Sequence, residues 1–413
     1  MGQDAIPTLD VVIVGGGHGG AQVAITLRQS GFAGTIAIVT DECEFPYERP
    51  PLSKEYFSGE KSAERLRIRP PAFWEEKGIA LILNKRVVAV DPDRHNVTTR
   101  DGLELGYRKL VWAAGGSPRR LSQAKGRDAN VLTIRTLGDA NRLKDEATQA
   151  SRVTVIGGGY IGLEAAAVLA KSGKQVTLVE ALDRVLARAA GVELSRYVES
   201  VHRSHGVDIR LGAKIHEFEG QAKVNAVRLA DGSRVDCDFV VAGIGIDPEV
   251  EPLKAAGARC GNGVEVDEYC RSSLPDVFAI GDCAAHRNTY AGCATVRLES
   301  VQNAVDMAKV VADCIAGSCQ GYHNVPWFWS NQYDIRIQTV GLSMGHDQTV
   351  IRGDMDGGAF SIVYLRRERV IALDCVNSVR DFAQGKALVV AGAQIPVERL
   401  ADTSMPLKDM FAR

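Results

Sequence analysis

Long apolar runs and a secretory leader are both missing from this 413-residue chain. No window approaches the roughly 18 apolar residues that a membrane-crossing helix needs. The longest apolar runs, such as the one at 239–246, have the length of strands. The first residues show neither the basic stretch nor the apolar core of a secretory signal. These absences lead us to expect no membrane span, and they predict a cytoplasmic location.

An excess of charge of one sign is also missing, since the formal net charge is -2. This balance argues against a general nucleic-acid-binding protein. The chain has 9 cysteines but no CxxC motif. Cys314 and Cys319 stand at the end of a helical pattern, and in a reducing compartment we expect them and the other cysteines to be free thiols. No metal site is predicted.

One glycine-rich pattern is present twice. A GxGxxG motif followed by a helical pattern occurs at Gly15, Gly17 and Gly20 and again at Gly157, Gly159 and Gly162. Apolar strands are expected on both sides of each motif, at 11–14, 35–39, 153–156 and 175–179. In such a β-loop-α-β unit the glycines allow a tight turn and the close approach of a pyrophosphate, which the amide groups at the helix N-terminus bind. The repeat therefore predicts two dinucleotide sites in a chain long enough for two or three domains.

An acidic residue follows the second strand of each unit. Asp41, with Glu42 beside it, and Glu180 stand 26 and 23 residues after the first glycine of their motifs. A carboxylate at this place can accept hydrogen bonds from ribose hydroxyls. Glu180 would also repel a 2′-phosphate, and the nearest base is Arg184, so the second site is predicted to take NADH rather than NADPH. The alternative is that each acid is simply solvated in a loop after its strand.

A third stretch, "SSLPDVFAIGDCA", ends an apolar strand at Gly281-Asp282. It resembles the second flavin-binding motif of the two-dinucleotide flavoprotein reductases, the glutathione-reductase-like superfamily. In that superfamily the matching aspartate bonds the ribityl chain of FAD. Residues 109–119 and 238–249 resemble the two crossovers between its FAD and NAD domains, although Ala114 stands where threonine is commoner.

The resemblance implies an α/β fold in which an NAD domain is inserted into an FAD domain, both of them Rossmann-like. Beyond residue 326 the pattern changes to successive strands divided by turns, with a helix at 378–392. We therefore expect a C-terminal α+β domain with an antiparallel sheet. The predicted domains are residues 1–116 and 247–325 for FAD, 117–246 for NAD and 326–413 for the C-terminal domain.

The segment "EFPYERPPLSKEYFSG" contains no cysteine. Disulfide-reducing members of the superfamily carry a redox CxxxxC on a helix at this place, and NADH peroxidases and oxidases carry one nucleophilic cysteine. Here a helix is expected to begin at "RPPLSK", and Cys43 lies before it as an inert thiol. By this resemblance the reduced flavin has no internal thiol to reduce, so its electrons pass to an external acceptor.

Three motifs indicate one particular branch of this superfamily. They are "PYERPPLSK", "GGGYIGLE" and "VPWFWSNQYDIRIQTVG". With the "MPLKDM" tail at 405–410 they are similar to the NADH-dependent ferredoxin reductases of bacterial oxygenase systems. This is the putidaredoxin reductase-like group, which includes the reductases of aromatic-ring dioxygenases. The resemblance implies that electrons pass from NADH through FAD to a [2Fe-2S] ferredoxin, which serves a P-450-type monooxygenase or an aromatic-ring dioxygenase.

Catalytic roles follow from the same resemblance. Lys54 matches a lysine beside flavin N5 that is paired with a glutamate, here Glu164, and a positive charge there stabilises the reduced flavin. Tyr160 matches a tyrosine that covers the flavin and moves aside for the nicotinamide. Each residue has an alternative interpretation. Lys54 would be an exposed lysine, Glu164 an acid that is favoured near a helix N-terminus, and Tyr160 a residue that packs between domains.

The predicted cofactor contacts fall into two sets. The FAD contacts are Gly15, Gly17, Gly19, Gly20, Asp41, Arg49, Pro50, Lys54, Val87, Ala113, Gly115, Arg135, Asp282, Val301 and Trp329. The NAD contacts are Gly157, Gly159, Tyr160, Ile161, Gly162, Glu180 and Gly245. Arg135 suits its role because a pyrophosphate needs a counter-charge, and a surface arginine is the alternative.

An acidic ferredoxin partner would be guided by a basic rim. Arg65, Arg67 and Arg69 are expected on one face of an extended segment, and a solvated charged face is the alternative. A rubredoxin reductase or an NADH oxidase is the second enzyme hypothesis, and the missing cysteine disfavours the oxidase. A hypothesis of another class is an NADH-sensing flavoprotein interaction module, similar to the apoptosis-inducing flavoprotein. The lack of long insertions argues against that module.

Overall fold

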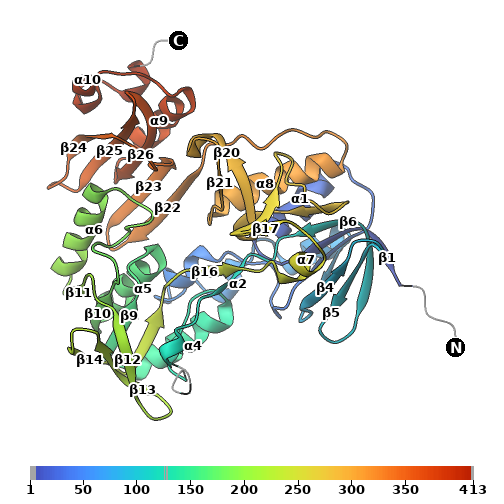
Figure 1. Cartoon of the computed structure of the whole chain (residues 1–413), viewed down its shortest axis with the longest axis horizontal. Coiled ribbons are helices and arrows are strands. Elements are labelled where there is room, and N and C mark those ends of the chain that lie inside the picture. Colours follow the sequence, from blue (N-terminus) through green and yellow to red (C-terminus); the bar gives the residue numbers. More distant parts are fainter. Residues whose placement is uncertain (1–5, 125, 127–128, 411–413) are drawn as a thin grey trace. The chain divides into compact units, whose positions relative to one another are not determined.

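The computed structural model describes residues 6–124, 126 and 129–410 (Figure 1). By its internal contacts the chain divides into two compact units, and each has its own architecture. The first unit comprises Met1–Glu48, Glu64–Ser117 and Asp247–Pro326, and the second comprises Arg49–Ala63, Pro118–Ile246 and Trp327–Arg413. In the described part of the chain no helix is long and apolar enough to cross a membrane.

The first unit is built on a seven-stranded sheet with the order β3-β2-β1-β6-β5-β4, in which β19 also pairs with β6. Its strands are β1 (Thr8–Val14), β2 (Ile36–Val39), β3 (Ile79–Ile82), β4 (Val87–Asp91), β5 (Asn96–Thr99), β6 (Glu104–Trp112) and β19 (Val277–Ala279). The strands β1, β2, β3, β6 and β19 run parallel, whereas β4 and β5 pair antiparallel. A second sheet consists of β17 (Cys260–Gly261), β18 (Gly263–Val266), β20 (Ala284–Asn288) and β21 (Ala294–Val296).

The core of the first unit lies around β1. Val11, Val12 and Ile13 have no exposed surface. An apolar run without polar alternation suits such a strand because both of its faces are covered. Helix α1 (His18–Gln29) follows β1 and contacts α8 (Val301–Ile315). The shorter helices are α2 (Ala63–Leu66), α3 (Pro71–Glu76) and α7 (Glu251–Ala255).

The second unit contains a parallel sheet with the order β11-β10-β9-β15-β8. These strands are β8 (Val131–Leu132), β9 (Arg152–Ile156), β10 (Gln175–Val179), β11 (Asp208–Arg210) and β15 (Phe239–Ala242). An antiparallel sheet accompanies it, with β12 (Ile215–Gly220), β13 (Val224–Leu229) and β14 (Arg234–Asp236). The helices of this part are α4 (Leu137–Gln149), α5 (Tyr160–Lys171) and α6 (Val192–Ser204).

Residues 327–410 of the second unit form an antiparallel sheet with the order β22-β23-β26-β25-β24. Its strands are β22 (Trp327–Gln332), β23 (Ile335–Gly341), β24 (Gln348–Asp354), β25 (Ala359–Arg366) and β26 (Arg369–Val376), followed by α9 (Val379–Ala391) and α10 (Val397–Ala401). The sequence predicted this sheet and its helix but not β22. The predicted fold class, two β-loop-α-β units with an antiparallel C-terminal sheet, is confirmed.

Short elements complete the chain. The strands β7 (Gly116–Pro118) and β16 (Ile246–Pro248) pair at the two crossovers of the chain. The 3₁₀ helices are η1 (Pro50–Ser53), η2 (Ser122–Ala124), η3 (Gly281–Cys283), η4 (Thr289–Ala291) and η5 (Leu407–Asp409).

Two local secondary-structure predictions were wrong. The helix expected at "RPPLSK" is only the 3₁₀ helix η1, followed by turns through Gly59. It stops at Lys54 because the backbone there leaves helical geometry, with φ -132° and ψ -109°. The segment carrying Arg65 is helical in α2 rather than extended, although Arg65, Arg67 and Arg69 are all exposed.

The prediction that Cys314 and Cys319 are free thiols was also wrong. The structure joins them in a disulfide, with 4.0 Å between their Cα atoms. Helix α8 ends at Ile315, and the chain turns at Gly317, where φ is +92°, so that Cys319 returns to the end of the helix. The sequence pattern predicted both cysteines at a helix end, but it did not show that the turn at Gly317 brings Cys319 back to Cys314.

Candidate functional site

The first glycine-rich loop joins β1 to α1 in the first unit. Gly15 has a φ of 111°, and a Cβ atom on it would lie 2.2 Å from the carbonyl oxygen of Ala113. A Cβ atom on Gly20 would lie 2.0 Å from the carbonyl oxygen of Gly15. Only glycine fits at these two positions, and the structure brings Gly15 together with both Gly20 and Ala113. Gly17 is the N-cap residue of α1.

The second loop repeats this geometry between β9 and α5 in the second unit. Gly157 has a φ of 101°, and its Cβ atom would lie 2.3 Å from the carbonyl oxygen of Gly243. A Cβ atom on Gly162 would lie 2.1 Å from the carbonyl oxygen of Gly157, and Gly159 is the N-cap residue of α5. Both loops lie at the carboxyl end of a parallel strand, which is where dinucleotides bind in open α/β sheets.

Both helices can offer amide groups to an anion. Their N-cap residues are glycines, which have no side chain to accept hydrogen bonds from the first amides. The first turns read HGGA and YIGL and contain no acid that would repel a diphosphate. The two loops therefore fit the pyrophosphate groups of two dinucleotides. We call them the first and the second cradle.

The acid of the second cradle lies against its loop. Glu180 follows β10 directly, and its carboxylate accepts hydrogen bonds from the amides of Gly158 at 2.6 Å and Leu182 at 2.8 Å. These bonds hold the carboxylate against the loop of the second cradle.

The acid of the first cradle has different neighbours. Asp41 is 50% exposed and forms an ion pair with Arg86 at 3.1 Å. Arg86 also bonds Glu249, at 3.0 Å. The residue nearest to the loop is Thr40, whose side chain would lie 3.4 Å from a Cβ atom on Gly16. The position that Glu180 holds in the second cradle is thus held by a threonine in the first.

Lys54 and Glu164 meet in the second unit, although 110 residues separate them in sequence. Their Nζ and Oε2 atoms are 2.7 Å apart, and the side chains are only 11% and 4% exposed. The alternative of an exposed lysine is therefore wrong. Ser53 also donates a hydrogen bond to Glu164 Oε2, at 2.6 Å, and Ser330 donates one to Oε1, at 2.6 Å. A buried carboxylate needs such partners to remain charged.

Tyr160 opens α5 in the second cradle. Its ring meets the ring of Phe328 edge to face, with 4.7 Å between centroids. Burial raises the pKa of the Tyr160 hydroxyl well above its usual value. The hydroxyl is buried, and the side chain of Thr339 lies near it.

The other predicted contacts of the first unit lie on four elements. Asp282 is in η3, directly after β19, and Val301 is the first residue of α8. Val87 begins β4 and is 6% exposed. A Cβ atom on Gly19 would lie 3.2 Å from Cδ1 of Ile280 and 3.5 Å from the carbonyl oxygen of Ala304. The start of α1 is therefore packed against η3 and α8.

Two further glycines on the predicted contact list stand at the crossovers of the chain. Gly115 has a φ of 67°, and its carbonyl oxygen accepts a hydrogen bond from Glu249 at 3.0 Å. Gly245 has a φ of 96°, and its carbonyl oxygen accepts one from Arg119 at 3.0 Å. Both positions need a residue that tolerates positive φ.

The remaining predicted contacts belong to the second unit. Arg49 donates a hydrogen bond from Nη1 to the carbonyl oxygen of Arg135 at 2.8 Å, and Pro50 opens η1. Trp329 lies on β22, with its ring 5.6 Å from that of Trp327. Ile161, on the first turn of α5, is 46% exposed.

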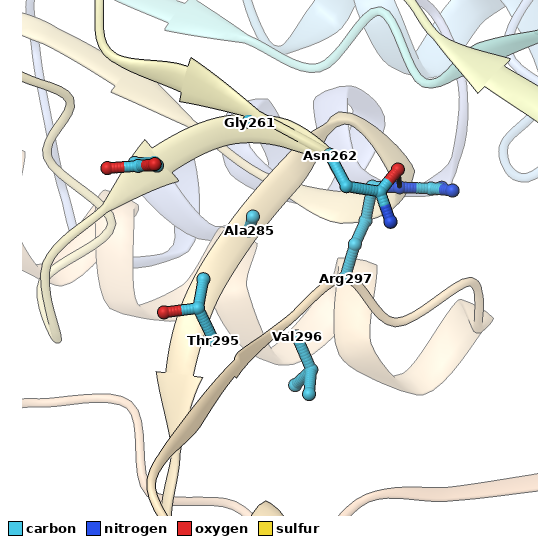
Figure 2. A pocket seen from close by; sticks show the side chains of 7 residues that line it. Gly261, Asn262, Ala285, Thr295, Val296 and Arg297 are labelled. Carbon is cyan, nitrogen blue, oxygen red and sulfur yellow. Dashed lines mark hydrogen bonds between the residues drawn. The ribbon is translucent and has the colours of Figure 1, made fainter.

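A cavity of about 430 Å³ in the first unit was not predicted from the sequence (Figure 2). Its lining includes Asn262 and Arg297, whose side chains lie beside each other in Figure 2. Arg297 Nε donates a hydrogen bond to Asn262 Oδ1 at 3.3 Å. Arg297 also donates a hydrogen bond to the carbonyl oxygen of Asp282 at 3.0 Å and pairs with Glu299 at 2.7 Å. It therefore supports the turn that carries Asp282. No sequence motif indicated this arginine.

The sulfur atoms lie outside the segment at 44–59. Cys43 is an exposed free thiol, and burial raises the pKa of Cys283 to about 12, so its thiol is protonated. The disulfide of Cys314 and Cys319 is at the opposite end of α8 from Val301. Within the described residues no cluster of three or more His, Cys, Asp or Glu could hold a metal ion.

Comparisons with known proteins agree with this geometry. The chain matches the pyridine nucleotide-disulphide oxidoreductase family over residues 9–308 and the reductase C-terminal family over residues 327–411. It is 55% identical over 409 residues to the 5,5'-dehydrodivanillate O-demethylase ferredoxin reductase subunit of Sphingobium sp., covering 98% of this chain and 99% of that protein. It is 41% identical over 410 residues to putidaredoxin reductase of Pseudomonas putida, covering 98% and 97%.

A solved structure gives the same result. The covalent complex of putidaredoxin reductase with putidaredoxin matches with a TM-score of 0.94 and 40% identity, covering 97% of this chain and 98% of that chain. The family indicated by the sequence motifs is thus confirmed over the whole length of its relatives. The chain belongs to the ferredoxin reductases of the pyridine nucleotide-disulphide oxidoreductase family, oxidoreductases that bind FAD and use a nicotinamide dinucleotide.

Proposed function

We propose that this protein passes electrons from NADH through FAD to a [2Fe-2S] ferredoxin of a bacterial oxygenase system. The observation that carries the proposal is the repeat of one cradle, at Gly15 and at Gly157, with the same backbone contacts in both copies. Two dinucleotides are what such a repeat accommodates. When bound, FAD supplies the exchange between a two-electron donor and one-electron acceptors.

The first cradle is assigned to FAD. Its loop, the turn with Asp282 and the start of α8 at Val301 belong to one unit, and Gly19 packs against that turn and helix. The amides at the start of α1 bind the diphosphate. The N-terminus of α8 offers a partial positive charge to a flavin that becomes negative on reduction.

The second cradle is assigned to NADH. The amides at the start of α5 bind the diphosphate, and Glu180 accepts hydrogen bonds from the ribose hydroxyls. Because Glu180 is held by the amides of Gly158 and Leu182, it cannot easily turn away from a 2′-phosphate. The repulsion favours NADH over NADPH.

Lys54 and Glu164 supply the charge that the reaction needs. Glu164 pairs with the Lys54 ammonium at 2.7 Å and holds it in one position. We assign to Lys54 the role of the cation beside the flavin and to Tyr160 the role of a cover that yields to the nicotinamide. The other predicted cofactor contacts remain part of this proposal.

The acceptor is proposed to be an acidic [2Fe-2S] ferredoxin that serves a P-450-type monooxygenase or an aromatic-ring dioxygenase. In support, the names of the relatives include an O-demethylase ferredoxin reductase subunit and a p-cumate 2,3-dioxygenase reductase component. The relatives also include a rubredoxin-NAD(+) reductase of Pseudomonas putida, which makes rubredoxin the second candidate acceptor. We also propose a cytoplasmic location and the domain limits predicted from the sequence.

The test compares electron acceptors under one set of conditions. Purified holoprotein and NADH are mixed with a [2Fe-2S] ferredoxin, a rubredoxin, a small quinone or oxygen, at several ionic strengths. The proposal expects the ferredoxin to be reduced fastest, with a rate that falls as salt increases. It is overturned if every ferredoxin is reduced far more slowly than the quinone, and the second candidate is favoured if rubredoxin is the fastest acceptor.

A further inference from the structure

A buried chain of hydrogen bonds leads away from Glu164 through the second unit. Ser330 Oγ donates to Glu164 Oε1 at 2.6 Å, and Gln332 Nε2 donates to Ser330 Oγ at 3.1 Å. His202 Nε2 lies 2.8 Å from Gln332 Oε1. Ser330 and His202 have no exposed surface, and Gln332 is 2% exposed. Burying this many polar groups in series is costly unless every one of them is paired.

The donor and the acceptor of each hydrogen bond in this chain can be assigned in turn, starting from the Glu164 carboxylate. Glu164 as a carboxylate can only accept, so Ser330 donates its hydroxyl proton to it. Ser330 then has only lone pairs left, so Gln332 presents its NH₂ group to Ser330 and its oxygen to His202. His202 must therefore carry a proton on Nε2. All the donors in the chain are aimed toward the Glu164 carboxylate.

His202, at the far end of this chain of hydrogen bonds from Glu164, is a neutral histidine. Burial is the main cause that lowers the pKa of His202 from 6.5 to about 4, so the imidazole is uncharged near neutral pH. With a proton on Nε2, its Nδ1 is the acceptor, and the Tyr333 hydroxyl lies 3.5 Å from it. The Tyr333 ring stacks on the exposed His205 with 3.7 Å between centroids. The chain therefore runs from a partly exposed aromatic pair to the buried carboxylate.

The two oxygens of Glu164 have different partners. Oε2 accepts from Lys54 and Ser53, whereas Oε1 accepts from Ser330. Hydrogen bonds to an ionised group are stronger than those between neutral groups, and donors in series polarise one another. Because Ser330 fastens Oε1 while Lys54 and Ser53 hold Oε2, the Glu164 carboxylate is held in one orientation.

We propose that Ser330, Gln332 and His202 are positioning residues that keep the Glu164 carboxylate turned toward Lys54, and so keep the positive charge of Lys54 in place for the flavin. The inference rests on the proposed function, in which Lys54 faces the flavin. Weakening the chain leaves Oε1 of Glu164 without its donor, so the carboxylate is no longer held in one orientation and positions the Lys54 ammonium less firmly. A cation that is displaced from the flavin stabilises the reduced flavin less well.

The first experiment measures the midpoint potential of the bound FAD in the holoprotein, by equilibration with a reference dye. Ser330→Ala is expected to lower the equilibrium constant for flavin reduction about tenfold, which is about 30 mV for a two-electron couple. Gln332→Leu should lower it less and His202→Leu least, because each lies one bond farther from the carboxylate. Ser330→Thr and His202→Gln keep the donors and should restore the wild-type potential.

The matched control is Asn331→Ala. Asn331 lies on β22 between Ser330 and Gln332, and its side chain is exposed on the other face of the strand. This variant should keep the wild-type potential. If the hydrogen-bond chain had only a structural role, the variants of Ser330, Gln332 and His202 would lose thermal stability but would all keep the wild-type midpoint potential of FAD.

The second experiment reads the tautomer of His202 by ¹⁵N NMR of histidine-labelled protein, with His202→Gln identifying the signal. The expected result is a proton on Nε2 and none on Nδ1 near neutral pH. A proton on Nδ1 overturns the inference, and so does a wild-type potential in both Ser330→Ala and Gln332→Leu. In those cases flavin bleaching by NADH still supports the proposed function, whereas the absence of bleaching in the wild-type protein overturns that function and this inference with it.

Discussion

The two cradles have the same backbone and different surroundings. Gly15 and Gly157 both have positive φ, and a Cβ atom on either would lie within 2.3 Å of a carbonyl oxygen. Beside the second cradle lies the carboxylate of Glu180, whereas Thr40 holds the matching place beside the first. The repeat thus preserves the loop that fits a diphosphate, a group common to all dinucleotides. The part that distinguishes one dinucleotide from another has diverged.

The first helical turns of the cradles differ as well. Gly19 and Ile161 hold the same place in the two motifs. A Cβ atom on Gly19 would press on Ile280, but the Ile161 side chain is 46% exposed. A closely packed turn suits a cofactor that stays bound, and an open turn suits a dinucleotide that enters and leaves at each turnover. We infer that packing around the loop, rather than the loop itself, separates the resident cofactor from the substrate.

The largest expected effect comes from breaking one cradle at a time. Gly157→Ala must place a Cβ atom in left-handed backbone and 2.3 Å from the Gly243 oxygen. We expect flavin reduction by NADH to slow at least about 100-fold while FAD stays bound, because a distorted loop cannot present its amides. Gly15→Ala should instead yield protein without FAD. Stopped-flow absorbance and the flavin content of the purified protein measure these outcomes.

The controls for this pair are Gly173→Ala and Gly31→Ala. Both glycines have a φ of +79° at the end of a helix, with nothing within 4 Å of the Cβ position. They should cost only about 1 kcal/mol of stability and leave both reactions intact. If Gly157→Ala removed FAD as readily as Gly15→Ala, the assignment of one dinucleotide to each cradle would be wrong.

Acid stability tests the burial of His202 in the second unit. Its pKa is lowered in the folded protein, so the stability it confers is complete above 6.5 and is lost as pH falls from 6.5 to about 4. The loss amounts to about 3 kcal/mol at most. His202→Gln cannot take up this proton, and we expect its free energy of unfolding to fall less between about pH 7 and pH 4. Denaturant unfolding of the holoprotein at both pH values measures the difference.

His286 in the first unit is the natural comparison, because burial also lowers its pKa from 6.5 to about 4. It bonds Asn288 at 3.1 Å rather than a chain that ends at a carboxylate. His286→Gln should reduce the acid loss in the same way and leave the flavin potential unchanged. Equal acid losses in His202→Gln and the wild-type protein would contradict the burial of a neutral imidazole at His202.

A smaller effect is expected at the two acids. Glu180→Gln should raise the KM for NADH about tenfold, because the amides of Gly158 and Leu182 then face a group that is no longer charged. The preference for NADH over NADPH should fall with it. Asp41→Asn, at the exposed acid of the first cradle, should leave the KM for NADH unchanged. Steady-state kinetics with both nucleotides would contradict this account if the two variants behaved alike.

The smallest effect is expected at the disulfide. Cys314 lies 13 residues after Val301 on α8, which is about 20 Å along a helix, so it is too far from that end to take electrons directly. Cys314→Ser should change the rate of ferredoxin reduction by no more than about twofold. The rate is measured for this variant and for the wild-type protein before and after mild reduction. A large loss of rate in the variant would indicate that the Cys314–Cys319 disulfide takes part in electron transfer.

The sequence predicted the parts of the molecule that local pattern determines. The two β-loop-α-β units and the strands after residue 335 were found because apolar runs, glycines and turns lie close together in sequence. The 3₁₀ helix at Pro50 was mistaken for a longer helix, since two prolines are compatible with either start. Local pattern also predicted ribose-binding acids at Asp41 and Glu180, but it did not show that Glu180 lies against its loop whereas Thr40 lies beside the other loop.

Contacts between distant residues could not be predicted in this way. Lys54 and Glu164 were paired through family resemblance alone, because nothing near either residue indicates the other. Ser330, Gln332 and His202 were missed because each of these residue types has many uses, and the Glu164 carboxylate at which their chain of hydrogen bonds ends lies far away in sequence, on α5. Only the three-dimensional fold shows that Ser330 and Gln332, alternate residues of β22, are both buried on the side of the strand that faces Glu164.

The most direct test of the central claim is an anaerobic titration of the purified yellow holoprotein with NADH, followed by counting its thiols and adding a [2Fe-2S] ferredoxin. The account predicts that the yellow colour bleaches, that no new thiol appears and that each NADH then reduces two ferredoxin molecules. Bleaching that is followed by new protein thiols and little reduced ferredoxin, or a failure to bleach at all, would contradict it.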